Sequence, residues 1–434
     1  MFASWSRTRS AVVAGVATAA LVLVANPEAQ ALEGIQSSHA IFYPSLELVY
    51  QHDDNFFLSE FNEVSADSFL ARANFALEIP GARHNLRLEY SPQYRNVNVN
   101  QGSFDLQDST SHFFDLQAHL HGSSVFSVDI ANSYALGSLE VDSIDPNRGE
   151  LLNRAGSRFW SNRLNVDFNW EGSTQGATIS VGRFDSNWDD LATSAPSWFE
   201  LNETTFGAEY AYKFTPLSRF VVGISFADTS QTPTGALRST AGIPNGVDPN
   251  SNRLGVHFGF AGELGRTTTG SAKIGFASLD YDQNAGNNAD WDGVTLDAAI
   301  TKAFSRYSKL AFSANRNVNF SGFATDVGGS PVWNTYYVSN RGAVTFTQQP
   351  QGGRVFWSLK GAFQRNTYDQ LAPTGRGGFS EREDDITSLR AELGYHPLEH
   401  LSLRFNYRYE ERESNLVGFG YTDNLIIFQA QLGF

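Results

Sequence analysis

The last eleven residues, Asn424–Phe434 (NLIIFQAQLGF), alternate between apolar and polar side chains. One face carries Ile426, Phe428, Ala430, Leu432 and Phe434, and the other carries Gln429, Gln431 and Gly433. Alternation with a period of two predicts a β-strand with one apolar side and one polar side. An aromatic residue at the chain end favours apolar surroundings for that side.

The same alternation recurs along the chain. Clear examples are Ser68–Ile79, Asn85–Arg95, Thr205–Phe214 and Leu401–Tyr409. Each segment has about ten residues, the length that a tilted strand needs to cross a bilayer. A water-soluble β-sandwich also alternates, but charged residues recur on the polar face of nearly every segment here. A wet interior and an apolar exterior are therefore predicted.

Short and long connections alternate between these segments. Short ones fall at 80–83, 121–124, 171–174, 215–218, 263–266, around Ser305-Arg306, at 349–353 and at 396–399. Longer polar ones include 53–67, 136–157, 187–201, 231–252 and 369–384. The pattern predicts an all-β fold, a transmembrane antiparallel outer-membrane β-barrel of about 18 strands, with short periplasmic turns and long extracellular loops. An even strand number places both chain ends on the periplasmic side.

The N-terminus resembles an export signal. Arg7 and Arg9 precede an apolar run from Ala11 to Ala25, and Ala29-Gln30-Ala31 forms a small-x-small cleavage site. These features predict a cleaved signal peptide over residues 1–31. Residues 32–40 would form a short periplasmic segment, and residues 41–434 the barrel. The predicted location is the outer membrane of a bacterial cell.

The composition limits the kinds of molecule that the protein is expected to bind. The chain has 434 residues, 13% aromatic, no Cys and a formal net charge of −15. Without Cys there are no disulfides, and the acidic balance argues against nucleic acid, which requires clustered Lys and Arg. The expected partners are outer-membrane lipids and lipopolysaccharide.

The polar faces supply candidate pore-lining residues of both charges. They are Arg72, Glu78, Arg87, Glu89, Arg163, Asp167, Glu209, Lys360, Arg390, Glu392, Arg404 and Arg408. A pore that selects one ion sign would carry a ring of one charge, whereas mixed charge suits a neutral or mildly anionic, hydroxylated solute. These residues could equally pair across strands and stiffen the wall.

No arrangement of residues predicts a catalytic site, a metal site or a cofactor. His52-Asp53-Asp54 could in principle serve a barrel protease, but such clusters are usually solvated loop residues. Glu381–Asp385 and Glu410–Glu413 predict an acidic outer rim. Its carboxylates would either be solvated or hold divalent cations that bridge lipopolysaccharide.

Two resemblances complete the interpretation. The final strand, with Phe428, Leu432 and Phe434, resembles the terminal signal by which the barrel-assembly machinery recognises outer-membrane barrels. Phe42–Leu48 and Tyr50–Phe57, which include Pro44 and Asp54-Asn55, resemble the opening strand of a family of outer-membrane β-barrel porins. That family is associated with exopolysaccharide biosynthesis loci.

The second resemblance implies a passive outer-membrane channel that exports an exopolysaccharide. Such a channel would work with an inner-membrane synthesis system and periplasmic export partners. One alternative is a diffusion porin that takes up small solutes. A second is an enzyme barrel that acts on lipid or peptide and depends on His52 or Asp53.

Overall fold

The computed structural model describes residues 35–433, except 38, 57, 59, 62, 101–107, 139–157, 190–198, 234–246, 285–289, 328–329, 351–353, 374–378 and 418. The predicted signal peptide and Phe434 lie outside the described residues. Most of the 136–157 and 231–252 connections do so as well.

Nineteen strands are described. They are β1 Ile35–Gln36, β2 Ile41–Asp53, β3 Ala66–Pro80, β4 His84–Val99, β5 Ser109–His121, β6 Phe126–Ser138, β7 Arg158–Glu171, β8 Gln175–Asp189, β9 Phe199–Thr215, β10 Ser218–Pro233, β11 Val247–Gly265, β12 Thr268–Asn284, β13 Trp291–Ser305, β14 Ser308–Val327, β15 Ser330–Gln348, β16 Val355–Pro373, β17 Phe379–Leu398, β18 Leu401–Ser414 and β19 Tyr421–Gly433.

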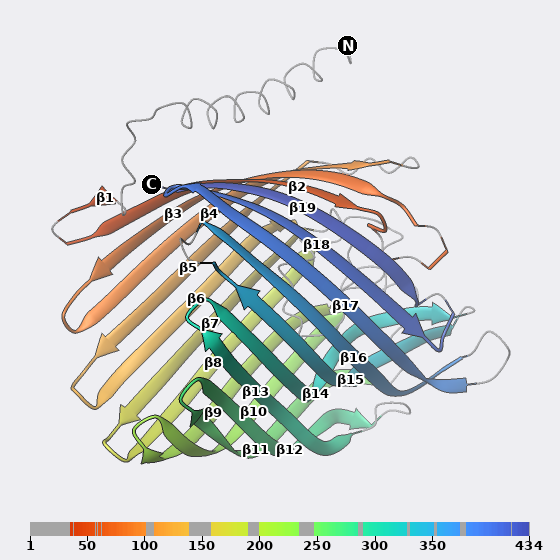
Figure 1. Cartoon of the computed structure of the whole chain (residues 1–434). Coiled ribbons are helices and arrows are strands. Elements are labelled where there is room, and N and C mark those ends of the chain that lie inside the picture. Colours follow the sequence, from red (N-terminus) through yellow and green to blue (C-terminus); the bar gives the residue numbers. More distant parts are fainter. Residues whose placement is uncertain are drawn as a thin grey trace.

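β2 to β19 form a closed ring in which each strand runs antiparallel to the next (Figure 1). The ring closes where β19 pairs with β2, from Leu425 opposite Asp53 to Gly433 opposite Ser45. The two-residue strand β1 pairs with the first residues of β2, beyond the end of β19. The predicted 18-strand antiparallel barrel is therefore confirmed, and we call the β2–β19 junction the seam.

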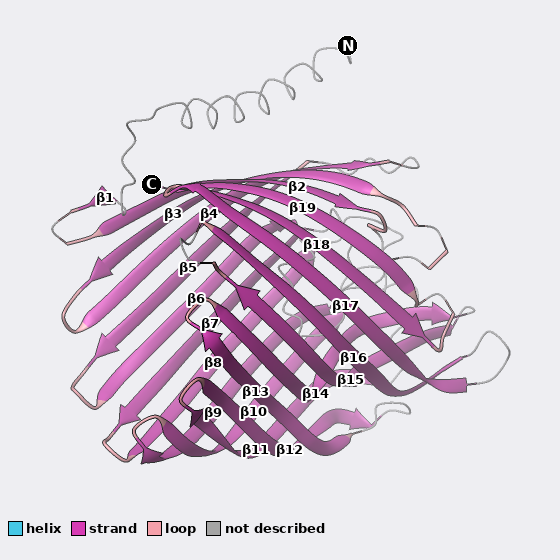
Figure 2. Ribbon diagram, viewed as in Figure 1, coloured by secondary structure: helices cyan, strands magenta, loops and turns pink. Residues whose placement is uncertain are grey.

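The connections after odd-numbered strands and those after even-numbered strands lie at opposite ends of the barrel (Figure 2). The short links that follow the odd-numbered strands from β3 to β17 lie at one end, together with Ile41 and Gly433. The links that follow the even-numbered strands lie at the other end, which we call the long-link end. No helix among the described residues is long and apolar enough to span a membrane.

The strands are longer than the predicted ten residues. The barrel strands β2–β19 range from 13 residues in β2 to 20 in β14 and β17. Most of the predicted 369–384 link belongs to strands, since β16 continues to Pro373 and β17 begins at Phe379. Neighbouring strands thus continue their hydrogen-bond ladder beyond the length that a bilayer requires. A strand length estimated from membrane thickness alone does not include this extension.

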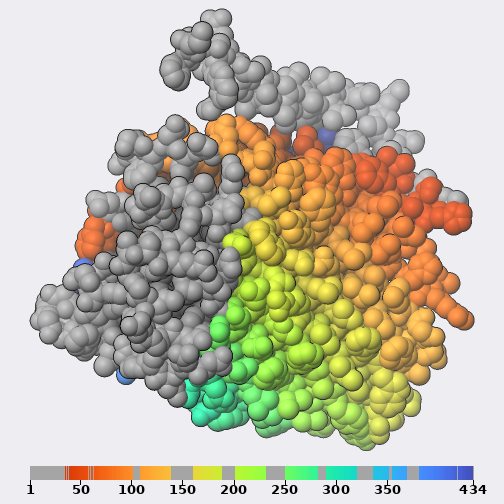
Figure 3. Space-filling view, turned by 180° about the vertical axis from the view of Figure 1, so that it is seen from behind, coloured from red at the N-terminus to blue at the C-terminus, as the bar shows by residue number. Residues whose placement is uncertain are grey.

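The outer face of the barrel is apolar. Phe206, Phe258 and Phe428 are 51%, 65% and 51% exposed, as expected for side chains that face lipid rather than a packed core. Figure 3 shows the continuous wall that the strands coloured orange to green present on one side. The alternation therefore resolves into an apolar exterior and a polar interior.

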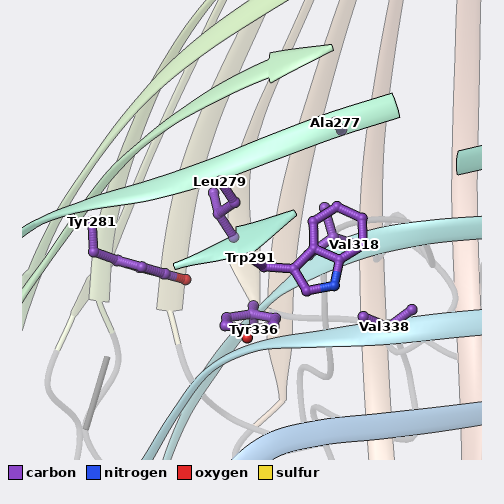
Figure 4. Close-up of a cluster of buried hydrophobic side chains, with 7 residues drawn as sticks. All are labelled: Ala277, Leu279, Tyr281, Trp291, Val318, Tyr336 and Val338. Carbon is purple, nitrogen blue, oxygen red and sulfur yellow. The ribbon is translucent and has the colours of Figure 1, made fainter. Parts of the chain in front are cut away.

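A buried apolar cluster joins strands at the long-link end (Figure 4). Its members are Ala277, Leu279, Tyr281, Trp291, Val318, Tyr336 and Val338. The rings of Tyr281 on β12 and Tyr336 on β15 stack with centroids 6.3 Å apart. Because β12 and β15 are three strands apart in the sheet, the two rings would lie roughly 14 Å apart if the wall were flat. The wall therefore folds at this point, and Tyr281 lies on the interior face of β12, opposite the exposed Ile274 and Phe276.

Candidate pore wall

All twelve candidate pore residues lie on the interior face of their strands. On each strand they occupy the positions that alternate with exposed apolar side chains, such as Phe75 on β3, Leu164 on β7 and Leu389 on β17. The period-two alternation therefore predicted their orientation. Their contacts divide the wall into two regions.

On β2–β4 the interior charges are paired. Arg72 Nη1 lies 3.6 Å from Glu47 Oε2, and Arg72 Nε donates to Gln93 Oε1 at 2.8 Å. Arg87 Nη2 lies 3.0 Å from Glu89 Oε2. These contacts match the alternative in which interior charges stiffen the wall.

The pairing continues on β9–β12. Glu209 Oε2 accepts from Lys273 Nζ at 2.5 Å and lies 3.1 Å from His257 Nε2. Among the other candidates, Glu78 accepts from Asn85 at 3.3 Å and Glu392 from Ser358 at 3.4 Å. Arg163 lies over the Phe184 ring at 5.2 Å and Arg404 over the Phe356 ring at 5.7 Å. Asp167 lies opposite Asp129 on β6.

On β15–β18 the interior cations gather. Lys360 lies opposite Arg390, and Arg390 lies opposite Arg408, so three cations stand side by side on consecutive strands. Arg341 on β15 is close enough to repel Lys360. We call Arg341, Lys360, Arg390 and Arg408 the basic row.

The basic row is only partly neutralised. Arg408 Nη2 lies 3.3 Å from Asp423 Oδ2, while Arg390 Nη2 donates to the neutral Asn406 Oδ1 at 3.4 Å. Within the described part of the chain Lys360 has no carboxylate within salt-bridge distance. Positive potential is therefore concentrated on this side of the interior.

Towards the long-link end the same strands carry a buried ionic network. Arg382 Nη2 lies 2.7 Å from Asp384 Oδ2, and Arg412 Nε donates to the same oxygen at 3.1 Å. Arg382 also lies over the rings of Tyr368 and Phe419, at 4.5 and 3.9 Å. Asp384 is fully buried. The prediction of a solvated acidic rim over 381–385 is therefore wrong for Asp384, because strand alternation turns it and Arg382 inward.

In the His52-Asp53-Asp54 cluster, the partner of His52 is Asp67 rather than Asp53. His52 Nδ1 lies 2.8 Å from Asp67 Oδ1 on β3, and Tyr50 donates to the same carboxylate oxygen at 2.7 Å. His52 and Asp53 are consecutive strand residues, so their side chains lie on opposite faces of the wall.

Asp54 and Asn55 instead join the first strand to the last. Asp54 accepts from the backbone N–H of Asn424 at 2.6 Å and from Asn424 Nδ2 at 2.7 Å. The buried Asn55 donates from Nδ2 to the backbone carbonyl of Thr422 at 2.8 Å. Sequence reasoning identified Asp54-Asn55 only as part of the resemblance of the opening strand and missed these partners, which lie about 370 residues away along the chain.

The predicted assembly residues lie at the seam where they are described. Phe428 contacts the ring of Phe405 with centroids 5.1 Å apart and that of Tyr50 at 6.5 Å. Leu432 is buried and lies opposite Leu46 and Leu401. Their recognition during assembly stays a prediction.

Known proteins share this architecture. Residues 244–434 match the family described as "Putative beta-barrel porin 2". The Acinetobacter baumannii OccAB4 structure is 11% identical, with 92% of this chain and 99% of that chain covered and a TM-score of 0.50. Pseudomonas aeruginosa OccK2 (OpdF), solved in complex with glucuronate, is 12% identical, with 91% and 96% covered and a TM-score of 0.50. No curated protein sequence matches the chain.

The closed 18-strand ring, its apolar exterior and its polar interior define a porin-like β-barrel of the bacterial outer membrane. The match to the porin family covers residues 244–434 of the chain. The predicted porin resemblance and outer-membrane location are thus confirmed. The opening segment 42–57, on which the resemblance was based, lies outside the matched residues.

Proposed function

We propose that the chain is a diffusion porin for small hydrophilic solutes that carry a negative charge. The basic row is the observation that carries this proposal. Four cations on consecutive strands face the interior, and Lys360 has no carboxylate partner among the described residues. Clustered charge of one sign on a low-dielectric wall raises the local concentration of solutes of the opposite sign.

The arrangement of the remaining interior charges supports a preference for small anionic solutes over a pore that does not distinguish solutes by charge. Charges on β2–β4 and β9–β12 are largely neutralised by their neighbours. The interior is therefore asymmetric: the charges on β2–β4 and β9–β12 are largely balanced, whereas cations predominate on β15–β18. A carboxylate would be attracted to the cationic wall, while hydroxyl groups would find hydrogen-bond partners elsewhere.

The barrel size also favours small solutes. An 18-strand barrel leaves an aqueous channel unless its interior is filled. The folded wall at Tyr281 and Tyr336, and the buried Arg382 network, both occupy interior positions at the long-link end. These features favour uptake of small solutes over the initial interpretation, the export of an exopolysaccharide.

Liposome swelling tests the proposal. Purified protein in vesicles is exposed to isosmotic glucuronate and to glucose, with empty vesicles as the blank. We expect both solutes to enter, with glucuronate favoured, and Lys360→Gln together with Arg390→Gln to remove the preference. Arg87→Gln changes the net charge at a paired site and is the control, which should keep the preference.

Export makes the opposite prediction. In a strain that lacks the gene, secreted polysaccharide would fall and polymer would accumulate in the periplasm. Unchanged polymer output together with solute entry into vesicles is the result expected for the diffusion porin. Impermeable vesicles and reduced polymer output would instead restore the export hypothesis.

A further inference from the structure

Three aspartates meet at the seam, at the long-link end of the barrel. Asp53 is the last residue of β2, Asp54 follows it, and Asp423 is the third residue of β19. One carboxylate oxygen of each lies within 4.8 Å of the others. The first and last strands of the barrel therefore bring together carboxylates that are far apart in the sequence.

Asp423 has an unsatisfied oxygen at this point. The residue is fully buried, and its Oδ2 accepts from Arg408 Nη2 at 3.3 Å. Its Oδ1 is also buried and has no hydrogen-bond partner among the described residues. A buried carboxylate oxygen without a donor or a cation is costly, so a group that binds it is to be expected.

The local charge identifies that group. Asp53, Asp54 and Asp423 supply three carboxylates against the one guanidinium group of Arg408. Glu410 lies opposite Asp423 on β18 and makes the surroundings more negative. When these carboxylates are ionised, the surplus of two or more negative charges calls for a divalent cation rather than a further hydrogen-bond donor.

The ligands are already held in place. The Asp53 carboxylate accepts from the backbone N–H of Asn55 at 3.0 Å, and Asp54 holds Asn424 through two hydrogen bonds. Each carboxylate oxygen keeps a second lone pair for a metal ion. Little further ordering is needed for the three side chains to bind a cation together.

We propose that Asp53, Asp54 and Asp423 bind one divalent cation, Ca²⁺, which fastens the first strand of the barrel to the last. Ca²⁺ takes oxygen ligands only and tolerates irregular geometry, whereas Mg²⁺ requires a near-ideal octahedron. The cation neutralises the surplus charge and satisfies the free oxygen of Asp423. Without it, the carboxylates of Asp53 and Asp423 would have to share a proton to remain in contact.

Calcium titration of the refolded full chain tests this site. The chain is refolded into detergent micelles free of lipopolysaccharide, treated with EDTA and then titrated with CaCl₂ by calorimetry, with the melting temperature followed in parallel. We expect one Ca²⁺ per chain and a rise in melting temperature that saturates with Ca²⁺, as mass action requires. Mg²⁺ should bind more weakly.

Variants locate the ion. Asp423→Asn and Asp53→Asn should each weaken Ca²⁺ binding by at least roughly tenfold and lose the calcium-dependent rise. Asp385→Asn removes a carboxylate that is paired with Arg365 on β16 and β17, away from the seam, and should respond as wild type does. If Asp423→Asn does not refold, Asp53→Asn still reports on the site, because it leaves the Asp423–Arg408 pair intact.

Several results would overturn the proposal. They are absence of Ca²⁺ binding by the wild-type chain, equal loss of binding in Asp385→Asn, or a wild-type melting temperature that rises on acidification but ignores Ca²⁺. The last outcome would show a proton shared between carboxylates. None of these readouts depends on transport, so the cation site and the porin proposal stand or fall separately.

Discussion

Asp54 and Asn424 are held together by two hydrogen bonds to the Asp54 carboxylate, from the backbone N–H of Asn424 at 2.6 Å and from its Nδ2 at 2.7 Å. They belong to opposite ends of the barrel chain, so this contact can form only when the ring closes. We therefore expect it to stabilise the seam. Asp54→Ala should reduce the free energy of unfolding by about 1.5–3 kcal/mol, the range for hydrogen bonds to a charged group.

Urea unfolding in detergent with EDTA present measures this change without any contribution from a bound cation. A double-mutant cycle with Asn424→Ala isolates the side-chain bond, since the backbone N–H survives in that variant. The two substitutions together should cost less than the sum of the single costs. Strict additivity would mean that the side-chain bond contributes nothing.

The buried Arg382–Asp384–Arg412 network predicts a strong effect of a small substitution. Asp384→Asn keeps the shape of the side chain but leaves two buried guanidinium groups without their shared counter-charge. Breaking one partner of a buried ion pair typically costs about 3–5 kcal/mol. We expect a loss of that size in urea-induced unfolding of the detergent-solubilised barrel.

The neighbouring residue supplies the control. Asp385 pairs with Arg365 at 2.6 Å, but this pair is open to solvent, with the side chains 33% and 51% exposed. Solvent screens such a pair, so Asp385→Asn should leave the unfolding curve nearly unchanged. Equal losses from the two substitutions would contradict the distinction between the buried network and the exposed pair.

The basic row predicts an anion preference that depends on salt. Replacing Lys360 and Arg390 with Gln should lower the ratio of anion to cation permeability, because two uncompensated interior charges are removed. The effect should be largest in dilute salt and fade near 1 M, where the screening length is about 3 Å. Reversal potentials across planar bilayers measure this ratio, and a preference that survives both substitutions would show that the row does not select the solute.

The sequence predicted the barrel because the decisive signals are local. Alternation along segments such as Thr205–Phe214 determines which side chains face lipid, and the rhythm of short and long links determines the antiparallel order. The interior position of Glu209 followed from its place between Ala208 and Tyr210. None of these inferences required knowledge of which strand lies beside which residue.

Contacts that depend on register could not be predicted in this way. The row formed by Lys360, Arg390 and Arg408 exists because three strands align these positions, and a shift by one residue would turn a side chain to the other face. The sequence predicts Asp384 in a solvated loop, because an estimate from membrane thickness starts the strand after this residue. In the structure β17 already begins at Phe379. The partners of Asp54 were hidden for the same reason, since closure joins the two ends of the chain.

The last strand predicts a difference between two of its apolar residues. Leu432 is 5% exposed, whereas Phe428 is 51% exposed and faces outward. Leu432→Ala should therefore cost about 2–5 kcal/mol in unfolding of the finished barrel, as for other buried Leu side chains, and Phe428→Ala should cost less in detergent. If Phe428 also acts as an assembly signal, Phe428→Ala should lower the amount of folded barrel in the outer membrane of cells more than its effect in urea would explain. Comparing folded barrel in cells with unfolding in detergent for the same two variants separates recognition from packing, and parallel losses in both assays would argue that Phe428 acts through packing alone.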